Sequence, residues 1–213
     1  MKINIDSNNY NFGGKKVKKI IAFLLTAITI CLSFAGCGTP TSSPIEDFSY
    51  EFKDGEVTIT GYIGTDREIV IPDTIEDRPV TVIGEKAFQG YDMTSIIIPN
   101  TITIIQKRAF DDCKRLEKID IPDSVTEISY WAFCGCENLK EVNLGSGVKS
   151  IEQGAFVSCD SLKSIHIPEN VVTLYDVRFG ISNNGNFDFV IYGKSGSAAE
   201  TYAKENNITF IEE

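Results

Sequence analysis

Hydrophobic positions recur along this chain with a step of 23 residues. Four segments of equal length align without gaps, and a longer one with a small insertion around Arg78-Pro79 precedes them: 93–115, 116–138, 139–161, 162–184 and 69–92. A fixed period of this length is typical of a solenoid, in which each repeat buries its apolar face against the next one. We therefore predict stacked coils over residues 69–186.

Each repeat opens with a short alternating stretch. Leu116, Ile119 and Ile121 are spaced as the inward side chains of a strand, which Pro122 ends. A second extended stretch, 125–128, turns two more aliphatic side chains inward. Strands of neighbouring coils should pair at about 4.8 Å.

An Ala-Phe pair follows in each repeat, at 87–88, 109–110, 132–133 and 155–156. We expect it on a short helical or 3₁₀ turn, where alanine permits close approach and phenylalanine fills the coil. The rings should form a continuous column at the centre of the core.

Cysteine occupies a fourth recurrent slot, at Cys113, Cys136 and Cys159, and Cys134 is an extra thiol. In this slot a thiol acts as a small buried hydrophobe. Disulfides between neighbouring coils stay open as an alternative, although parallel side chains suit their torsion poorly. A zinc site needs a tetrahedron of ligands, which a ladder does not offer, so no metal is expected.

The recurrent pattern L-x-x-I-x-I-P-x-x-V-x-x-I-G-x-x-A-F-x-x-C, over about residues 69–184, closely resembles the BspA-like (Treponema-type) class of leucine-rich repeat. The resemblance implies a leucine-rich repeat solenoid of the α/β class, mostly short parallel strands with short helical turns. In such proteins the strand sheet usually lines the surface that meets a partner.

Both ends of the stack carry signals of caps, which a solenoid needs to protect its open edges. Residues 47–71 alternate around Asp54-Gly55 and predict a β-hairpin N-terminal cap. A strand–helix–strand C-terminal cap is predicted over 187–213, with strands at 187–192 and 208–211. Its helix should open at a capping box, Ser197 with Glu200, and run to about Asn206.

The N-terminal residues 1–36 read as a signal peptide, whose synthesis starts at Met1 or at Val17. Lysines precede an apolar run from Ile20 to Phe34, which is shorter than the roughly 20 residues of a spanning helix. The stretch "FAGC" resembles a bacterial lipobox, so Cys37 is the predicted lipid attachment site, with ordinary cleavage as the alternative. Residues 37–46 then form the lipidated cysteine and a flexible tether.

Charge restricts the possible partners. Residues 37–213 hold 29 acidic and 15 basic side chains. Such a surface repels phosphate backbones and anionic lipid heads, so we expect no nucleic acid partner and membrane contact through the lipid anchor only.

The outward positions of the strands form the candidate binding face. Two columns of side chains differ from coil to coil: Ser95, Lys118, Glu141 and Ser164 in one, and Ile97, Asp120, Asn143 and His166 in the other. His166 with Ser164 and Asp120 suggests a catalytic triad, but strand neighbours point the same way instead of forming a relay. A second candidate patch, Tyr130 with Trp131, is expected on another face.

The family resemblance implies adhesion, with host matrix proteins or bacterial surface proteins as partners. We predict a monomeric, non-catalytic binding module that is exported and lipid-anchored to the outer face of the bacterial membrane. The chain carries none of the familiar enzyme motifs, and no cofactor is expected. A structural role in the cell envelope without an external ligand, or an enzyme activity without a recognised motif, stays open.

Overall fold

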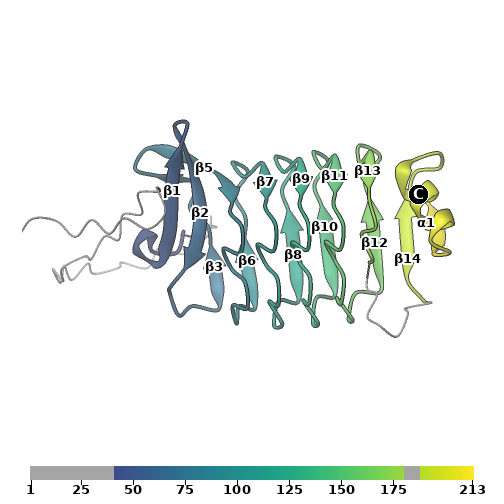
Figure 1. Cartoon of the computed structure of the whole chain (residues 1–213), viewed down its shortest axis with the longest axis horizontal. Helices are drawn as coiled ribbons and strands as arrows, with labels where there is room; N and C mark the ends of the chain where they lie inside the picture. The colour runs from purple at the N-terminus through teal and green to yellow at the C-terminus, as the bar shows by residue number, and fades with distance from the viewer. Residues whose placement is uncertain (1–40, 180–187) are drawn as a thin grey trace, which may run out of the picture.

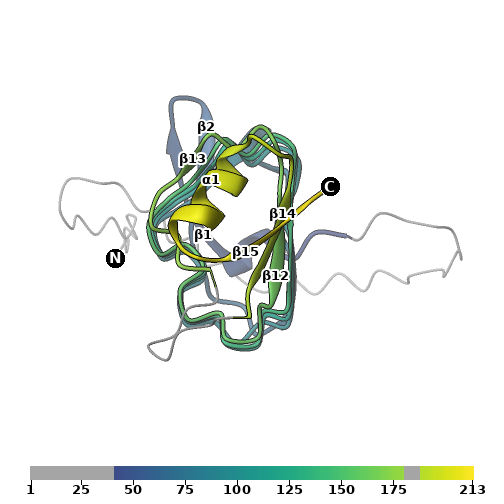
Figure 2. The ribbon, with the colours of Figure 1, turned by 90° about the vertical axis from the view of Figure 1, so that its right-hand side faces the viewer.

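The computed structural model describes residues 41–179 and 188–213. The chain winds into a solenoid whose coils stack along one axis, from the β1–β2 hairpin at one end to α1 at the other (Figure 1). The predicted solenoid of repeated coils is therefore confirmed. Viewed along the axis, the coils superimpose and their two rows of strands lie on opposite sides (Figure 2).

The first strand of each coil contributes to one row. Its strands pair in parallel as β3 with β6, β8 with β10, and β12 with β14 and then β15. The bounds are Glu68–Val70 (β3), Ser95–Ile97 (β6), Lys118–Ile121 (β8), Glu141–Leu144 (β10), Ser164–Ile167 (β12), Val190–Gly193 (β14) and Thr209–Glu212 (β15).

The second extended stretch of each coil builds the opposite row, which is one continuous ladder from β1 to β13. Its strands are Phe48–Lys53 (β1), Glu56–Tyr62 (β2), Arg78–Ile83 (β5), Ile104–Ile105 (β7), Glu127–Ile128 (β9), Ser150–Ile151 (β11) and Thr173–Leu174 (β13). Matching residues pair from coil to coil, so every inward side chain meets its counterpart.

The predicted phenylalanine column is confirmed and forms the centre of the core. Its rings are almost completely buried, and neighbouring centroids lie 5.0–5.8 Å apart at interplanar angles of 2–18°. The column comprises Phe88, Phe110, Phe133, Phe156, Phe179 and Phe189. Tyr62 tilts against its first ring, and Tyr202 packs edge-on against Phe179.

The prediction of a short helical turn at Ala-Phe is wrong. Two left-handed residues frame the turn in the four coils from 69–92 to 139–161, such as Trp131 (φ 54°) and Gly135 (φ 70°) around Phe133. They make alternate N–H groups point in opposite directions. The Phe133 N–H donates to Ala155 of the next coil at 2.9 Å, whereas the Ala132 N–H donates back to Ser129 at 3.2 Å. The turn thus adds a third ladder of backbone hydrogen bonds between coils. In a helix, the same N–H groups would bond within their own coil.

At the N-terminal end, β1 and β2 form the expected antiparallel hairpin. Asp54 and Gly55 connect them with φ of 52° and 89°, as a two-residue type I′ turn requires. β2 pairs with β5, so the hairpin continues the second row of strands. The insertion before β5 folds as a second small hairpin with β4 (Thr74–Ile75).

The tether predicted for 37–46 joins the fold at Ser43, which is buried. The Ser43 N–H donates to the Val70 carbonyl at 2.9 Å, and its Oγ accepts from the Val70 N–H at 3.0 Å. The 3₁₀ helix η1 (Ile45–Asp47) follows directly. Ser43 therefore occupies the open edge of β3, whereas 37–40 lie outside the described residues.

The strand–helix–strand order at the C-terminal end matches the prediction, with α1 at Ala198–Glu205. The predicted capping box does not form. Glu200 accepts from the Gly196 N–H at 2.7 Å, whereas the Ser197 N–H donates to the Lys194 carbonyl at 3.2 Å. Ser197 makes no side-chain cap, and its Oγ is buried without a partner. Whether either end segment prevents edge pairing stays a prediction. Within 41–179 and 188–213 no helix is long and apolar enough to cross a membrane.

Truncating the middle of the column should destabilise the whole solenoid. We expect Phe133→Ala to lower the free energy of unfolding by about 3–5 kcal/mol, because the cavity lies between two stacked rings. Chemical denaturation of the full chain measures this loss. Val172→Ala, at an exposed position, is the control and should stay within about 0.5 kcal/mol of the parent. Equal losses in the two variants would contradict the column's role.

Candidate functional site

The structure places the eight candidate face residues on β6, β8, β10 and β12, where all of them are exposed. Strand pairing sets Lys118 beside Glu141 and Asp120 beside Asn143. The two predicted columns of outward side chains are therefore present on this strand face, and its binding role stays a prediction. Along each strand these outward residues alternate with inward ones, such as Ile119 and Val142, which are buried in the core.

A polar network fills the middle of the strand face. The Lys118 ammonium lies 2.8 Å from Glu141 and 3.4 Å from Asp120. The Asn143 amide donates to Asp120 at 2.7 Å and to Glu141 at 2.8 Å. The hydrogen bond from Lys118 lowers the pKa of Glu141 from its ordinary value. These four exposed side chains are thereby oriented as one unit.

Apolar side chains flank this network along the same column. Ile97 is 46% exposed on one side, and Tyr192 and Ile211 continue the column on the other side, because β14 pairs with β12 and β15 pairs with β14. The last two were not predicted as part of the face. They belong to the C-terminal segment, whose spacing does not follow the repeat.

His166 and Ser164 do not form a catalytic relay in the structure. The His166 Nε2 atom lies 3.9 Å from a carboxylate oxygen of Glu213, which is longer than a hydrogen bond. Asp120 instead contacts Lys118 and Asn143. The sequence offered no signal for the Glu213 contact, because the two residues are far apart along the chain.

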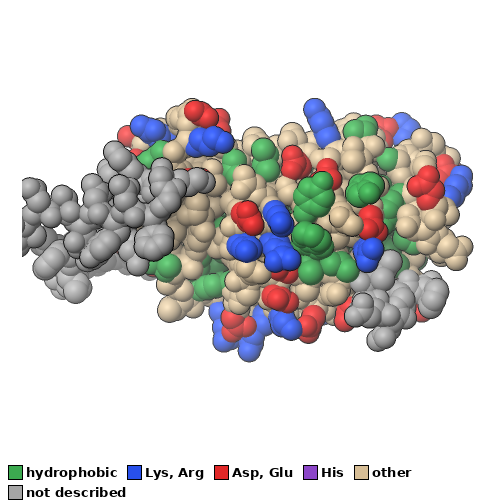
Figure 3. All heavy atoms as spheres, viewed as in Figure 1, with side chains coloured by type: hydrophobic (Ala, Val, Ile, Leu, Met, Phe, Trp, Pro, Cys, Tyr) green, Lys and Arg blue, Asp and Glu red, His purple; other side chains and the backbone are tan. Residues whose placement is uncertain are grey.

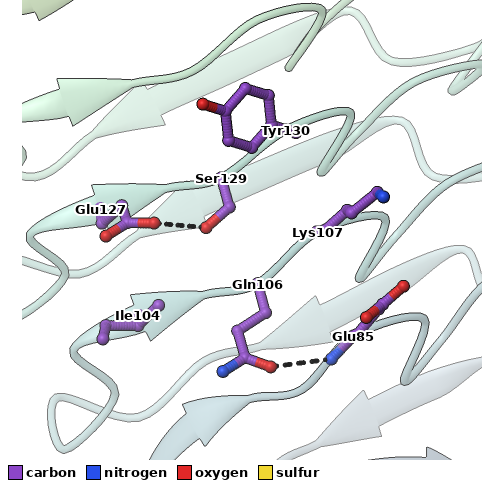
Figure 4. Close-up of a pocket in the computed structure, with 7 residues that line it drawn as sticks. All are labelled: Glu85, Ile104, Gln106, Lys107, Glu127, Ser129 and Tyr130. Carbon is purple, nitrogen blue, oxygen red and sulfur yellow. Dashed lines mark hydrogen bonds between the residues drawn. The ribbon is translucent and has the colours of Figure 1, made fainter.

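The opposite row of strands carries a shallow depression of about 380 Å³ on its outward side. Figure 3 shows the surface of the solenoid in the view of Figure 1, on which hydrophobic and charged side chains are interspersed. Figure 4 shows the lining of the depression, in which side chains of three consecutive coils lie beside one another. The lining residues are Glu85, Ile104, Gln106, Lys107, Glu127, Ser129 and Tyr130. Only Tyr130 was a candidate from the sequence, because depressions between coils depend on how neighbouring coils meet.

The predicted aromatic patch is only half exposed. Tyr130 is 44% exposed, but the neighbouring Trp131 ring is covered by Lys107 and Arg108, whose cationic groups lie 5.6 and 5.2 Å from its centroid. The indole also lies against the next coil, since a Cβ on Gly154 would come within 2.5 Å of it. Trp131 is therefore a fixed support, and Tyr130 is the accessible ring.

The ladder cysteines Cys113, Cys136 and Cys159 are buried, as predicted, and form no disulfide among the residues that the structure describes. That they stay free thiols in the oxidised protein remains a prediction. Each thiol also donates to a phenylalanine carbonyl of the preceding coil, at 3.1–3.2 Å. The slot thus requires a small side chain that can donate, which explains cysteine better than a purely apolar role. No group of three potential metal ligands occurs in the described part of the chain.

Cys134 is the more accessible thiol, and its environment suppresses ionisation. Burial, followed by the charge and hydrogen bond of Asp111, raises the pKa of Cys134 to about 12. Burial is also the main cause that raises the pKa of Cys159. Near neutral pH both groups remain protonated and weakly nucleophilic.

The native thiols should therefore resist alkylation. At about pH 8, a pKa of about 12 leaves Cys134 with about a thousandth of the thiolate of a thiol at the ordinary value of 9.0. We expect slow labelling of Cys134 and none of the ladder cysteines in the native protein, with all four labelled in denaturant without reductant. Intact mass and peptide mapping measure this. Absent labelling in denaturant would instead indicate disulfides.

Comparison with known proteins agrees with the geometry. The sequence model of the "BspA type Leucine rich repeat region" matches residues 68–209 in six copies. The crystal structure of a leucine-rich repeat protein from T. pallidum is 26% identical, with a TM-score of 0.66, over 71% of each chain. None of the curated proteins matches.

Two further solved structures share the fold. A leucine-rich repeat protein from Bacteroides ovatus is 32% identical with a TM-score of 0.59, over 76% of this chain and 42% of that one. The pneumococcal vaccine antigen PcpA is 19% identical with a TM-score of 0.58, over 80% and 49% of the two chains. With six repeat copies spanning most of the described solenoid, the chain belongs to the family of BspA-type leucine-rich repeat proteins.

Proposed function

We propose that this protein is a non-catalytic binding module that holds a protein partner on its strand face. The observation that best supports this proposal is the contrast between the two sides of each strand. Inward positions repeat the same residue types from coil to coil, whereas the outward columns change from each coil to the next, and only serine recurs, at Ser95 and Ser164. A uniform core with a varied exposed surface is the arrangement by which a solenoid separates scaffold from recognition.

The chemistry of the face favours a partner with basic and apolar groups. Asp120, Glu141 and Glu213 contribute three carboxylates to the face, against the one ammonium of Lys118. The central network is already oriented, so little side-chain entropy is lost on binding. Ile97 and Ile211 supply apolar contacts at the two ends of the column.

We propose a bacterial cell-surface location for this module. PcpA, a pneumococcal vaccine antigen, shares the fold, and the lipobox-like stretch before Cys37 supports a lipid anchor. Adhesion to host matrix or to other bacteria is the use we infer for an outward-facing binding module. A scaffold role in the envelope predicts no external ligand and is separated by the binding experiment below.

Reversing one charge at the centre of the face should weaken partner binding. We expect the full chain to bind at least one member of a panel of immobilised matrix proteins and intact bacterial cells. Asp120→Lys should weaken that binding about tenfold or more, because it breaks the network and repels a basic partner. His166→Glu adds a negative charge to the same face and tests whether the position of His166 contributes to partner binding.

Glu205→Lys, which makes the same charge change on exposed α1, is the matched control and should leave binding unchanged. Equal effects of Asp120→Lys and Glu205→Lys on binding would show that the partner does not contact the strand face. A complete lack of binding across the panel would favour the scaffold role.

Lipidation should depend on Cys37 alone. In a bacterial host fed labelled palmitate, the parent chain should incorporate label and Cys37→Ala should not, because the lipobox cysteine carries the acyl chains. Cys31→Ala, inside the apolar run, is the control and should remain labelled. Unchanged labelling of Cys37→Ala would refute the anchor.

A further inference from the structure

We propose that the depression beside Tyr130 is a second binding site, which takes neutral sugar units of a glycan. Its volume of about 380 Å³ lies at the low end of the range of about 300–1,000 Å³ for small-molecule sites. It lies on the row of strands opposite the strand face, because Ile104 belongs to β7 and Glu127 to β9, so the two sites can be occupied together (Figure 2). The site is independent of the proposed protein partner.

Tyr130 provides an accessible aromatic surface. Tyr130 is 44% exposed, and its ring centroid lies 6.3 Å from that of Trp131 at an angle of 52°. The negative face of an aromatic ring attracts weakly positive C–H groups. A pyranose ring presents such C–H groups on one face while its hydroxyls point outward, so it can stack on a tyrosine.

Hydrogen-bond donors and acceptors line the depression beside the Tyr130 ring. The Gln106 Oε1 atom accepts from the Glu85 N–H at 3.1 Å, which orients the amide, while its Nε2 makes no hydrogen bond within the described structure. Ser129 donates to Glu127 at 2.5 Å, which fixes that carboxylate and leaves it further acceptor capacity (Figure 4). Sugar hydroxyls are donors and acceptors at once, so different hydroxyls of one sugar unit can accept from Gln106 and donate to Glu127.

The charges of the lining exclude other ligand classes. Two carboxylates, of Glu85 and Glu127, face one ammonium, of Lys107, which is also attracted to the Trp131 ring. The site therefore has no strong excess of either sign for an ionic ligand. Ile104 is the one aliphatic side chain of the lining, so the depression does not suit a purely apolar ligand. A neutral ligand rich in hydroxyls matches these groups best.

The chain carries its own reporter for this site. Trp131 is the only tryptophan of the sequence and lies directly behind Tyr130. We expect titration of the full chain with chitotetraose, cellotetraose or maltotetraose to change the Trp131 emission saturably for at least one of these sugars. The affinity should stay the same between about 50 and 500 mM salt, because the contact is not ionic.

Tyr130→Ala should weaken this binding about tenfold, and Tyr130→Phe should retain it, because stacking requires the ring and not the hydroxyl. Tyr175→Ala, at an exposed tyrosine outside the lining, is the matched control and should bind like the parent. Unchanged thermal unfolding of the three variants verifies that the solenoid is intact.

Three results would overturn the proposal. One is the absence of a saturable response to all three tetrasaccharides, measured up to about 50 mM, beyond which even a weak small-ligand site should fill. Another is equal affinity of Tyr130→Ala and the parent chain. The third is a response confined to a sulfated saccharide and lost at high salt, which would assign the site to the cation Lys107 instead.

Discussion

The structure depends on one constraint: each coil must meet the next in the same register. The stacked rings from Phe88 to Phe189 and the parallel backbone ladders both depend on this register. A shift of one coil would break the ring stacking and the hydrogen bonds of the ladders at the same time. Where coils come closer than usual, glycine is required. A Cβ on Gly145 would lie 2.5 Å from the Pro122 carbonyl, which explains why glycine stands here in place of the proline of other repeats. A Cβ on Gly147 would likewise collide with the Asp123 carbonyl.

This constraint also explains the left-handed residues at the Ala-Phe turn. A non-glycine residue in this conformation costs about 1–2 kcal/mol, yet Lys86, Arg108 and Trp131 adopt it in successive coils. The cost is offset because alternate N–H groups then reach the neighbouring coil, as from Phe110 to Ala132 at 2.8 Å. Backbone geometry at this turn is therefore set by contacts between coils and not by local preference.

A core that repeats leaves the outer surface free to vary. The strand face and the depression beside Tyr130 use different slots of the same coils, and neither contributes to the phenylalanine column. Side chains there are oriented by neighbours one coil away, as Asn143 is by Asp120 and Gln106 by the backbone of Glu85. Recognition surfaces in this protein thus arise from the same stacking that stabilises the fold.

The sequence alone determined the period, the phenylalanine column, the ladder of cysteines and the columns of the strand face. These features are local or repeat at a constant step, so alternation and spacing suffice to place them. The hairpin turn at Asp54-Gly55 likewise depends only on its own residues. The lipid site Cys37 lies outside the described residues and stays a prediction.

Tertiary structure alone decided how the coils meet. The left-handed turn replaced the expected helical one, Ser43 joined the edge of β3, and Glu213 came to lie beside His166. The depression likewise draws its lining from three coils, so no single repeat contains it. All of these depend on the distance and rotation between neighbouring coils, which a repeat period does not specify because it counts residues and not their positions in space.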